Sequence, residues 1–274
     1  MIDIFLICLA FVWLIFASIE DLKKREVEDW VNFSLIIFAL GGRFFYSLFT
    51  NDFSVLYSGL IGFAIFFILG YVFYYGKFFA GADAKLMMAF GAILPFSSNL
   101  IINLKGFVLF FFIFFMVGSV YGLLWSGFLT LVNIKKVKTN FVSLFKKEIK
   151  LVYFVLFLVV LFFALGFVFS FCFLISLFFL VLPLLFVWAK SLDNVCMIKS
   201  VKPAELTEGD WLVKDISYNS KTIHANWDGL SKHEIRLLVK RGKNVFVRYG
   251  IPFIPVFLIS FAIFLYFRNW VYLF

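Results

Sequence analysis

Residues 79–90 read FAGADAKLMMAF, and this stretch places a carboxylate, Asp83, and an ammonium, Lys85, at the start of an apolar helical run. Small residues surround the acid, so another backbone can approach it closely. Ionisable side chains at membrane depth are costly to bury, and proteins usually keep them for function. Asp is also a strong N-cap residue, so capping of the following helix is the alternative interpretation. The stretch therefore predicts a helix start that carries either a cap or a reactive acid.

The composition around this stretch indicates the class of protein. Of the 274 residues, 64% are hydrophobic and 44 are phenylalanine. A soluble domain cannot expose such a surface to water, so we predict an all-α polytopic membrane protein whose partner is the lipid bilayer. The net charge of +9 is gathered in a few loops, as the positive-inside rule describes, which argues against a nucleic-acid partner.

Hydrophobic runs predict about eight transmembrane helices. The first, residues 2–19, has no basic n-region and no small-residue cleavage site, so we expect a retained span and not a removed signal peptide. Residues 151–189 carry no charged side chain and would extend about 60 Å as one helix, about twice the hydrocarbon thickness. They are therefore expected to form a hairpin that turns between residues 166 and 176. The other spans are expected at residues 30–49, 55–76, 84–103 with a kink at Pro95, 105–134 and 251–267.

Basic side chains set the expected orientation of these spans. Arg43, inside the second span, is expected to snorkel to the outer interface. Gly59, Gly62 and Gly70 in the third span indicate close helix packing. The segments predicted to be cytoplasmic are residues 20–29, 77–83, 133–150 and 190–248.

Residues 190–248 have fewer apolar side chains and more turn residues than the rest of the chain. They predict a small α+β cytoplasmic module between a membrane catalytic domain, residues 1–189, and a final transmembrane helix, residues 249–274. Ser231 and Glu234 form a capping-box pattern, and Gly242 marks the end of the helix that follows it. Short strands are expected at WLVKDI (211–216), KTIHANW (221–227) and NVFVRY (244–249), with a turn at residues 218–220.

Cysteine and histidine give no sign of a metal site. Cys8, Cys172 and Cys196 form no CxxC pair and no metal-ligand spacing, so we interpret them as packing residues. His224 and His233 lie in a polar region without a partner ligand. We expect neither a metal nor a cofactor.

The predicted topology brings a second acid to the membrane face that holds Asp83. Asp21 follows the first span and Asp83 begins the fourth, so both lie at helix ends on the cytoplasmic side. Two carboxylates held close together do not both ionise readily, so one keeps a proton. An aspartyl protease needs such a pair, because one acid activates water while the other polarises the scissile carbonyl. The alternative for Asp21 is an ordinary juxtamembrane charge among many charges.

These two blocks resemble the archaeal prepilin and prearchaellin peptidases, which are class III signal peptidases. SIEDLKKREVEDW (18–30) is similar to the first catalytic block of that family, and AGADAKLMMAFGAILP (80–95) is similar to its second, GxGD-type block. PAELTEGDWLVKDI, LSKHEIRLLVKRGK and GIPFIPVFLISF are similar to its cytoplasmic module and final span. The literal glycine pattern is not met, because Ala80 and Ala82 replace the glycines and Gly81 lies between them.

The resemblance implies a membrane-embedded aspartyl endopeptidase without a cofactor. It implies Asp21 and Asp83 as the catalytic acids, with Gly81 and Lys85 in supporting roles. Lys85 would act on Asp83 as a nearby cation, which favours the charged form of an acid. The implied reaction is the removal of short basic leader peptides from pilin-like precursors, prepilins or prearchaellins, at the cytoplasmic face of the cell membrane.

A basic leader would need anions at that face, and the segment after the first span supplies them. The alternative is that these acids only offset the neighbouring bases Lys23, Lys24 and Arg25. The acids expected to bind the leader are Glu20, Glu26, Glu28 and Asp29.

Two other functions remain open from the sequence. The first is an ion-coupled transporter or channel with Asp83 and Arg43 along its path, although the other spans carry few polar residues to build one. The second is a catalytically silent assembly protein of a pilus or archaellum. Cleavage of a precursor that depends on both acids distinguishes the protease from these two.

Overall fold

The computed structural model describes residues 1–147, 149–218, 221–227 and 229–268. Packing divides the chain into two compact units, and we describe each by itself. The first contains residues 1–122 and 251–274, and the second contains residues 123–250.

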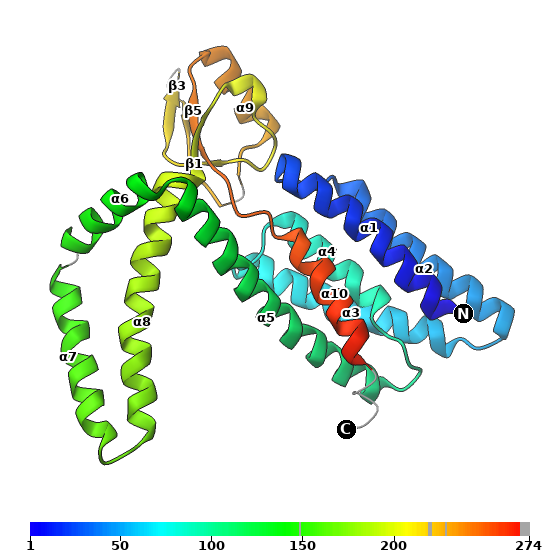
Figure 1. The fold of residues 1–274 in the computed structure, drawn as a ribbon. Helices are drawn as coiled ribbons and strands as arrows, with labels where there is room; N and C mark the ends of the chain where they lie inside the picture. The colour runs from blue at the N-terminus through cyan, green and yellow to red at the C-terminus, as the bar shows by residue number, and fades with distance from the viewer. Residues whose placement is uncertain (148, 219–220, 228, 269–274) are drawn as a thin grey trace. The chain divides into compact units, whose positions relative to one another are not determined.

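The structure confirms a helical polytopic membrane protein with a small sheet module near the C-terminus (Figure 1). By length and composition, five helices among the described residues can cross a membrane, or six if the bent pair 134–147 and 152–166 forms one span. The predicted number of eight is therefore approximate. The five helices are Ile2–Lys24, Asp29–Thr50, Ser54–Tyr75, Leu100–Val132 and Phe171–Met197.

The first unit consists of helices packed around an apolar core. Phe90, Phe110, Phe114 and Phe257 are buried there, and the rings of Phe114 and Phe257 lie 4.7 Å apart. Its elements are α1 (Ile2–Lys24), α2 (Asp29–Thr50), α3 (Ser54–Tyr75), α4 (Gly81–Ile93), α10 (Ile254–Phe267) and the first part of α5 (Leu100–Val132).

The close packing predicted for the third span is confirmed where α3 crosses α4. A Cβ atom on Gly62 would lie 2.4 Å from the carbonyl oxygen of Gly91, and a Cβ on Gly91 would lie 2.4 Å from that of Gly62. Each glycine therefore permits a backbone contact that no larger residue allows. This contact fixes α4, which carries Asp83, against a membrane-spanning helix.

The predicted kinked continuation of the fourth span towards Asn103 is wrong. Helix α4 ends at Ile93, two residues before Pro95, because proline disfavours helix in the residue before it. The side chain of Asn103 then holds the turn, accepting from the N–H of Ser97 and donating to its carbonyl. Helix α5 begins at Leu100, so Lys105 lies inside it.

The predicted snorkelling of Arg43 is also wrong, because its side chain is 1% exposed. Its guanidinium donates to the carbonyl oxygens of Ala92, Ile93 and Pro95 at 2.6–3.1 Å, and to that of Val55. The last carbonyls of a helix have no partner within the helix, and they carry partial negative charge. Arg43 therefore caps the C-terminal end of α4.

The second unit begins with the last part of α5 and continues through α6 (Ile134–Lys147), α7 (Ile149–Gly166) and α8 (Phe171–Leu192). The predicted hairpin is confirmed, with its turn at residues 167–170. The predicted basic loop is instead a helix, α6, because apolar residues recur at helical spacing between its lysines. The hydroxyl of Ser191 in α8 donates to the carbonyl of Val137 and holds α6 in place.

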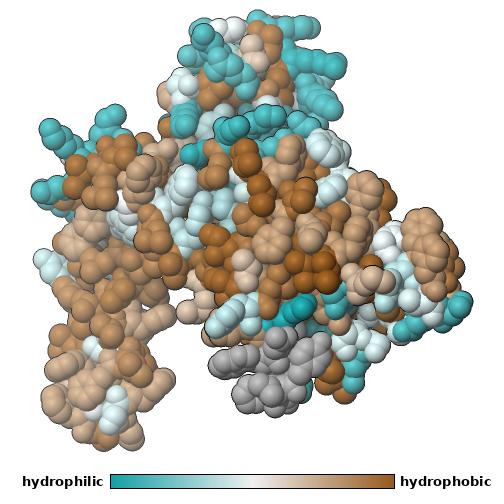
Figure 2. All heavy atoms as spheres, turned by 45° about the vertical axis from the view of Figure 1, so that its right-hand side comes forward, coloured by the Kyte–Doolittle hydropathy of each residue, from teal (hydrophilic) through white to brown (hydrophobic). Residues whose placement is uncertain are grey.

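The rest of the second unit is the sheet module, residues 193–250. Figure 2 shows hydrophilic side chains over it and hydrophobic side chains over the α7–α8 hairpin. Helix α9 (Lys232–Arg241) has the predicted capping box of Ser231 and Glu234, and Gly242 ends it with a φ of 68°. The other elements are η1 (Asp193–Met197), β1 (Ile198–Val201), η2 (Pro203–Glu205), β2 (Trp211–Leu212), β3 (Ile216–Tyr218), β4 (Lys221–Ile223) and β5 (Val245–Arg248).

The strands differ in part from the predicted ones. Strand β5 lies between β1, which the sequence did not predict, and β2. The predicted strand at 211–216 is divided, because β2 pairs with β5 whereas β3 pairs with β4. Within the turn predicted at 218–220, residues 219 and 220 lie outside the described residues.

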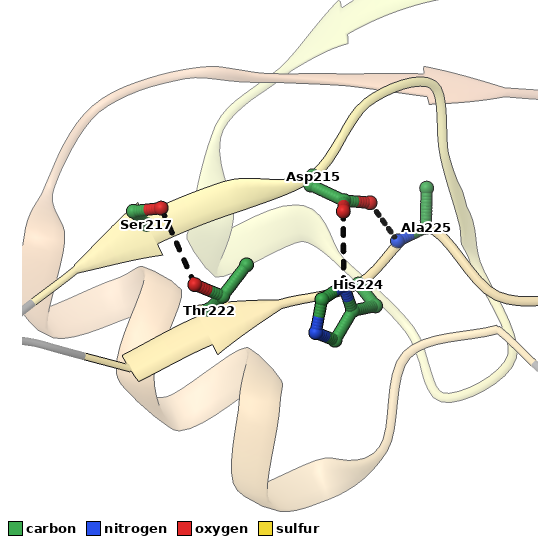
Figure 3. Close-up of polar contacts among 5 residues, drawn as sticks. All are labelled: Asp215, Ser217, Thr222, His224 and Ala225. Atoms are coloured by element: carbon green, nitrogen blue, oxygen red, sulfur yellow. Dashed lines mark hydrogen bonds and ion pairs between the residues drawn. The ribbon is translucent and has the colours of Figure 1, made fainter.

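Asp215 closes the end of the β3–β4 hairpin (Figure 3). Its carboxylate accepts from the N–H of Ala225 at 2.8 Å and lies 2.9 Å from Nδ1 of His224. These two hydrogen bonds hold the pKa of Asp215 below its usual value. His224 therefore has a structural partner in the module.

Candidate active site

Asp21 lies in the last turn of α1, because that helix continues to Lys24 and not only to residue 19. Its side chain is 6% exposed. Oδ2 accepts a hydrogen bond of 2.9 Å from the backbone N–H of Ile254, the first residue of α10. The carboxylate thus lies at the N-terminal end of another helix, where unpaired N–H groups favour negative charge.

Asp83 is the third residue of α4 and is partly buried. Its carboxylate accepts a hydrogen bond from the backbone N–H of Ala80, the N-cap residue. The sequence suggested Asp83 as the N-cap, but the N-cap residue is Ala80, and Asp83 contacts the N-cap backbone from within the first turn. This contact does not exclude a second role, because a carboxylate has several acceptor positions.

The structure brings the two acids into one electrostatic environment within the first unit. The negative charge of Asp21 acts on Asp83, while the positive charge of Arg25 acts on Asp21. The charges of Asp21 and Arg25 also act on the hydroxyl of Tyr121 in α5. Each acid thus approaches the other from the end of a different helix.

This pair of acids lies inside a segment that has relatives among known proteins. Residues 8–127 match the type IV leader peptidase family. The matched residues include Asp21, Asp83 and Tyr121, and they do not include α10.

Three curated relatives carry the name preflagellin peptidase. The one from Methanocaldococcus jannaschii is 39% identical over 85 residues, which are 31% of this chain and 36% of that protein. Those from Methanococcus maripaludis and Methanococcus voltae are each 35% identical over 82 residues, 30% of this chain and 35% of each protein. The chain thus spans about a third of the length of the relatives it matches. No solved structure matches it.

The alanines that replace the glycines of the leader peptidase pattern cause no backbone strain in this structure. Ala80 has a φ of −70° and a ψ of 166°, which any residue adopts, and Ala82 lies inside α4. Gly81 begins the helix, and a Cβ there would meet only Tyr74, at an ordinary 3.9 Å. This conformation therefore needs no glycine before Asp83.

Lys85 does not have the partner that the sequence suggested. Its ammonium pairs with the carboxylate of Asp29 at the start of α2 and lies 5.9 Å from the ring centroid of Phe33. The charged side chain that acts on Asp83 is instead that of Asp21. Lys85 therefore fastens α4 to α2, and Asp29, expected to bind a leader, already has a base of its own chain.

The other acids expected to bind a leader surround the connection between α1 and α2. Glu28 is exposed, lies 3.5 Å from Lys24 and accepts from the indole N–H of Trp30. Glu20 has only 13% of its side chain exposed and lies 4.0 Å from the same lysine. Glu26 is exposed. A basic leader would therefore have to compete with Lys24 for Glu28.

Sequence reasoning missed two contributors to this site. The first is the N–H of Ile254, which binds Asp21 although the two residues are 233 apart in the sequence. No local sequence pattern predicts this contact. The second, Tyr121, lies inside a predicted span. Its hydroxyl was the available signal, and it was missed because the reasoning considered charged residues. Among the described residues, no group of three or more His, Cys, Asp or Glu side chains is placed to hold a metal ion.

Proposed function

We propose that this protein is a membrane-embedded aspartyl endopeptidase. The observation that carries the proposal is the placement of Asp21 and Asp83, from the ends of α1 and α4, where one carboxylate acts on the other. Its residues 8–127 match a family of leader peptidases, which supports the same chemistry.

The surroundings of the two acids favour different roles for them, one as a general base and the other as a general acid. Burial opposes the charged form of Asp21, whereas the backbone N–H of Ile254 and the nearby Arg25 favour it. Asp83 accepts from Ala80 and faces the negative charge of Asp21, which favours its protonated form. Asp21 then takes a proton from water as the water attacks the scissile carbonyl, and Asp83 donates its proton to the carbonyl oxygen. Asp21 then gives the proton that it took to the amine nitrogen, the C–N bond breaks, and a hydroxyl of the intermediate returns a proton to Asp83. This releases the two peptides and restores both acids.

We propose precursors of the preflagellin and prepilin type as the substrates, because the curated relatives are named preflagellin peptidases. The reaction would take place at the cytoplasmic face of the cell membrane, where the positive-inside rule puts the Lys23–Arg25 stretch. The exposed acids Glu26 and Glu28 would bind the basic residues of the leader at that face.

The transporter alternative required Asp83 and Arg43 along an ion path, and the position of Arg43 does not fit that role. Arg43 was to line an ion path, yet its guanidinium is buried against four backbone carbonyls. A side chain fixed in this way caps a helix and does not conduct.

Incubation of the purified protein with a preflagellin-type precursor tests the proposal. We expect one cleavage between leader and mature chain, identified by the masses of both products. The Glu26→Gln, Glu28→Gln double variant should raise KM about 25-fold and leave kcat mostly unchanged, because partly exposed ion pairs contribute about 1 kcal/mol, or about fivefold, each. A leader whose lysines are replaced by glutamine is the matched control, and on it the variant and the wild type should agree. An intact precursor after incubation with wild-type protein would contradict the proposal.

A further inference from the structure

Two buried polar side chains near the acid pair have no hydrogen-bond partner among the described residues. Both amide atoms of Asn32 in α2 lack one, and its side chain is 0% exposed. The hydroxyl of Ser18 in α1 also lacks one, at 5% exposed. Proteins rarely leave buried amides and hydroxyls unpaired, so each such group in a native fold calls for a partner.

Helix geometry gives the level of each of these two groups along α1 relative to Asp21. Ser18 precedes Asp21 by three residues and shares the buried face of α1 with it, about one turn away. Two cross-links show that α2 runs antiparallel to α1. The rings of Phe16 and Trp30 lie 5.7 Å apart, and the indole N–H of Trp13 donates to the hydroxyl of Ser34 at 2.9 Å.

Asn32 falls between these two cross-links on α2. It is therefore level with the part of α1 between Trp13 and Phe16, about one turn beyond Ser18. Asn32 also lies on the same buried stripe of α2 as Arg43, which contacts the C-terminal end of α4. It is one turn from Asp29, which pairs with Lys85 near the N-terminal end of α4. Measured along the axis of α1, Ser18 and Asn32 thus lie at levels about one and two turns from Asp21, towards the apolar core of the first unit.

We propose that Asn32 and Ser18 bind ordered water and deliver it to the acid pair. This inference rests on the proposed function, since only a hydrolase consumes water at these acids. A buried water makes about three hydrogen bonds, and the amide oxygen, amide nitrogen and hydroxyl supply an acceptor, a donor and a group that serves as either. Acids that are largely shielded by helices need such a supply, because each cleavage removes one water molecule from between them.

A structure at a resolution that shows ordered water tests the binding directly and without any activity. We expect a water peak within hydrogen-bond distance of Asn32 and another, or the same one, at Ser18. Asn32 in contact with carbon atoms alone would overturn the inference, whether or not the protein is a protease.

Two variants with a matched control test delivery. Asn32→Leu and Ser18→Ala remove the polar groups, and Ser47→Ala removes a buried, unpartnered hydroxyl on α2 about 22 Å further along the helix. We expect Asn32→Leu and Ser18→Ala to lower kcat about tenfold or more, with KM unchanged. Their melting temperatures should stay close to that of the wild type, because the apolar side chain removes the polar group together with its bound water. Ser47→Ala should keep the wild-type kcat.

The outcomes separate this inference from the proposed function. Wild-type kcat in Asn32→Leu and Ser18→Ala would overturn the water site and leave the protease intact. Equal losses in Ser47→Ala would also overturn it, because the effect would then follow from any buried hydroxyl. If the wild-type protein cleaves no precursor, the proposed function fails, and the water peaks at Asn32 and Ser18 still decide whether the site exists.

Discussion

Asp21 and Asp210 have nearly the same immediate surroundings but belong to different units of the molecule. Asp21 is 6% exposed and Asp210 is 7% exposed. Each accepts a backbone N–H at 2.9 Å, Asp21 from Ile254 and Asp210 from Thr207. Each also has a second donor, the backbone of Phe253 for Asp21 and the side chain of Thr207 for Asp210. The donor to Asp210 lies three residues before it, whereas the donor to Asp21 belongs to another helix.

The comparison shows that burial and hydrogen bonds from neighbouring groups do not by themselves make a reactive acid. Asp210 holds its own loop in shape, since Thr207 both donates to its side chain and accepts from its backbone N–H. Asp21 has in addition a second carboxylate, Asp83, within electrostatic reach. A pair of coupled acids can pass protons during a reaction, and a lone capping acid serves stability.

The largest expected effect comes from neutralising the acids in turn. Asp21→Asn and Asp83→Asn should each lower kcat/KM about 10²- to 10⁴-fold, because amides neither take nor give the proton. Asp210→Asn should lower it less than twofold, because its role is confined to the module. Cleavage assays on the three purified variants measure this. If Asp210→Asn were as inactive as the other two, the distinction between the acids would be wrong.

A smaller effect is expected when Asp21 loses its donor. Ile254→Pro removes the N–H at the first position of α10, where helices accept proline, together with the buried isoleucine side chain. A hydrogen bond to a charged group contributes about 1.5–3 kcal/mol, so kcat should fall about tenfold or more. The acidic limb of the pH–rate profile should move to higher pH, because that bond favours the charged form. Ile254→Ala keeps the N–H and is the control, and equal behaviour of the two variants would show that the bond is structural.

A still smaller effect is expected at the Lys85–Asp29 pair, whose side chains are 34% and 63% exposed. Exposed ion pairs contribute about 1 kcal/mol or less, so Lys85→Met and Asp29→Asn should each cost at most about fivefold in kcat/KM. Their double variant should lose no more than either alone, with an unchanged pH–rate profile. A shifted profile in Lys85→Met alone would mean that Lys85 acts on Asp83 after all.

The smallest expected effect concerns the stability of the module. Burial raises the pKa of Asp210 in the folded state, so the folded module binds its proton more tightly than the unfolded chain does. The contribution of Asp210 to stability is thus greatest below its ordinary pKa of 3.8 and declines as pH rises through the folded value. Melting of the full chain can be followed by circular dichroism of the Trp211–Trp227 pair, whose ring centroids lie 4.4 Å apart with the rings tilted by 30°. Relative to Asp210→Asn, the wild type should lose melting temperature as pH rises, and a parallel pH dependence would contradict this.

Features that depend on local chemistry could be predicted from the sequence. The capping box of Ser231 and Glu234 defines α9, because both partners lie within one turn. The α7–α8 hairpin follows from an uncharged run too long for one span. The two acids could be named because each has its own sequence block and charge patterning puts both at one face.

Features that depend on contacts between distant segments could not be predicted. An arginine in a span can reach the interface or cap a helix, and only the carbonyls at the end of α4 decide that Arg43 does the latter. The bond from Ile254 to Asp21 likewise joins segments with no shared pattern. Strand β1 has four residues and is defined by its pairing with β5. Helix α6 was not predicted, because its lysines are as typical of a cytoplasmic loop as of a helix.

A double-mutant cycle on Asp21 and Asp83 tests the central claim that the two acids work as one pair. Precursor cleavage is measured for the wild type, Asp21→Asn, Asp83→Asn and the double variant under one set of conditions. If the acids share one reaction, the first substitution removes the activity and the second removes nearly nothing more, so the double variant equals the singles. Losses that multiply, or near-normal turnover in either single variant, would contradict the claim.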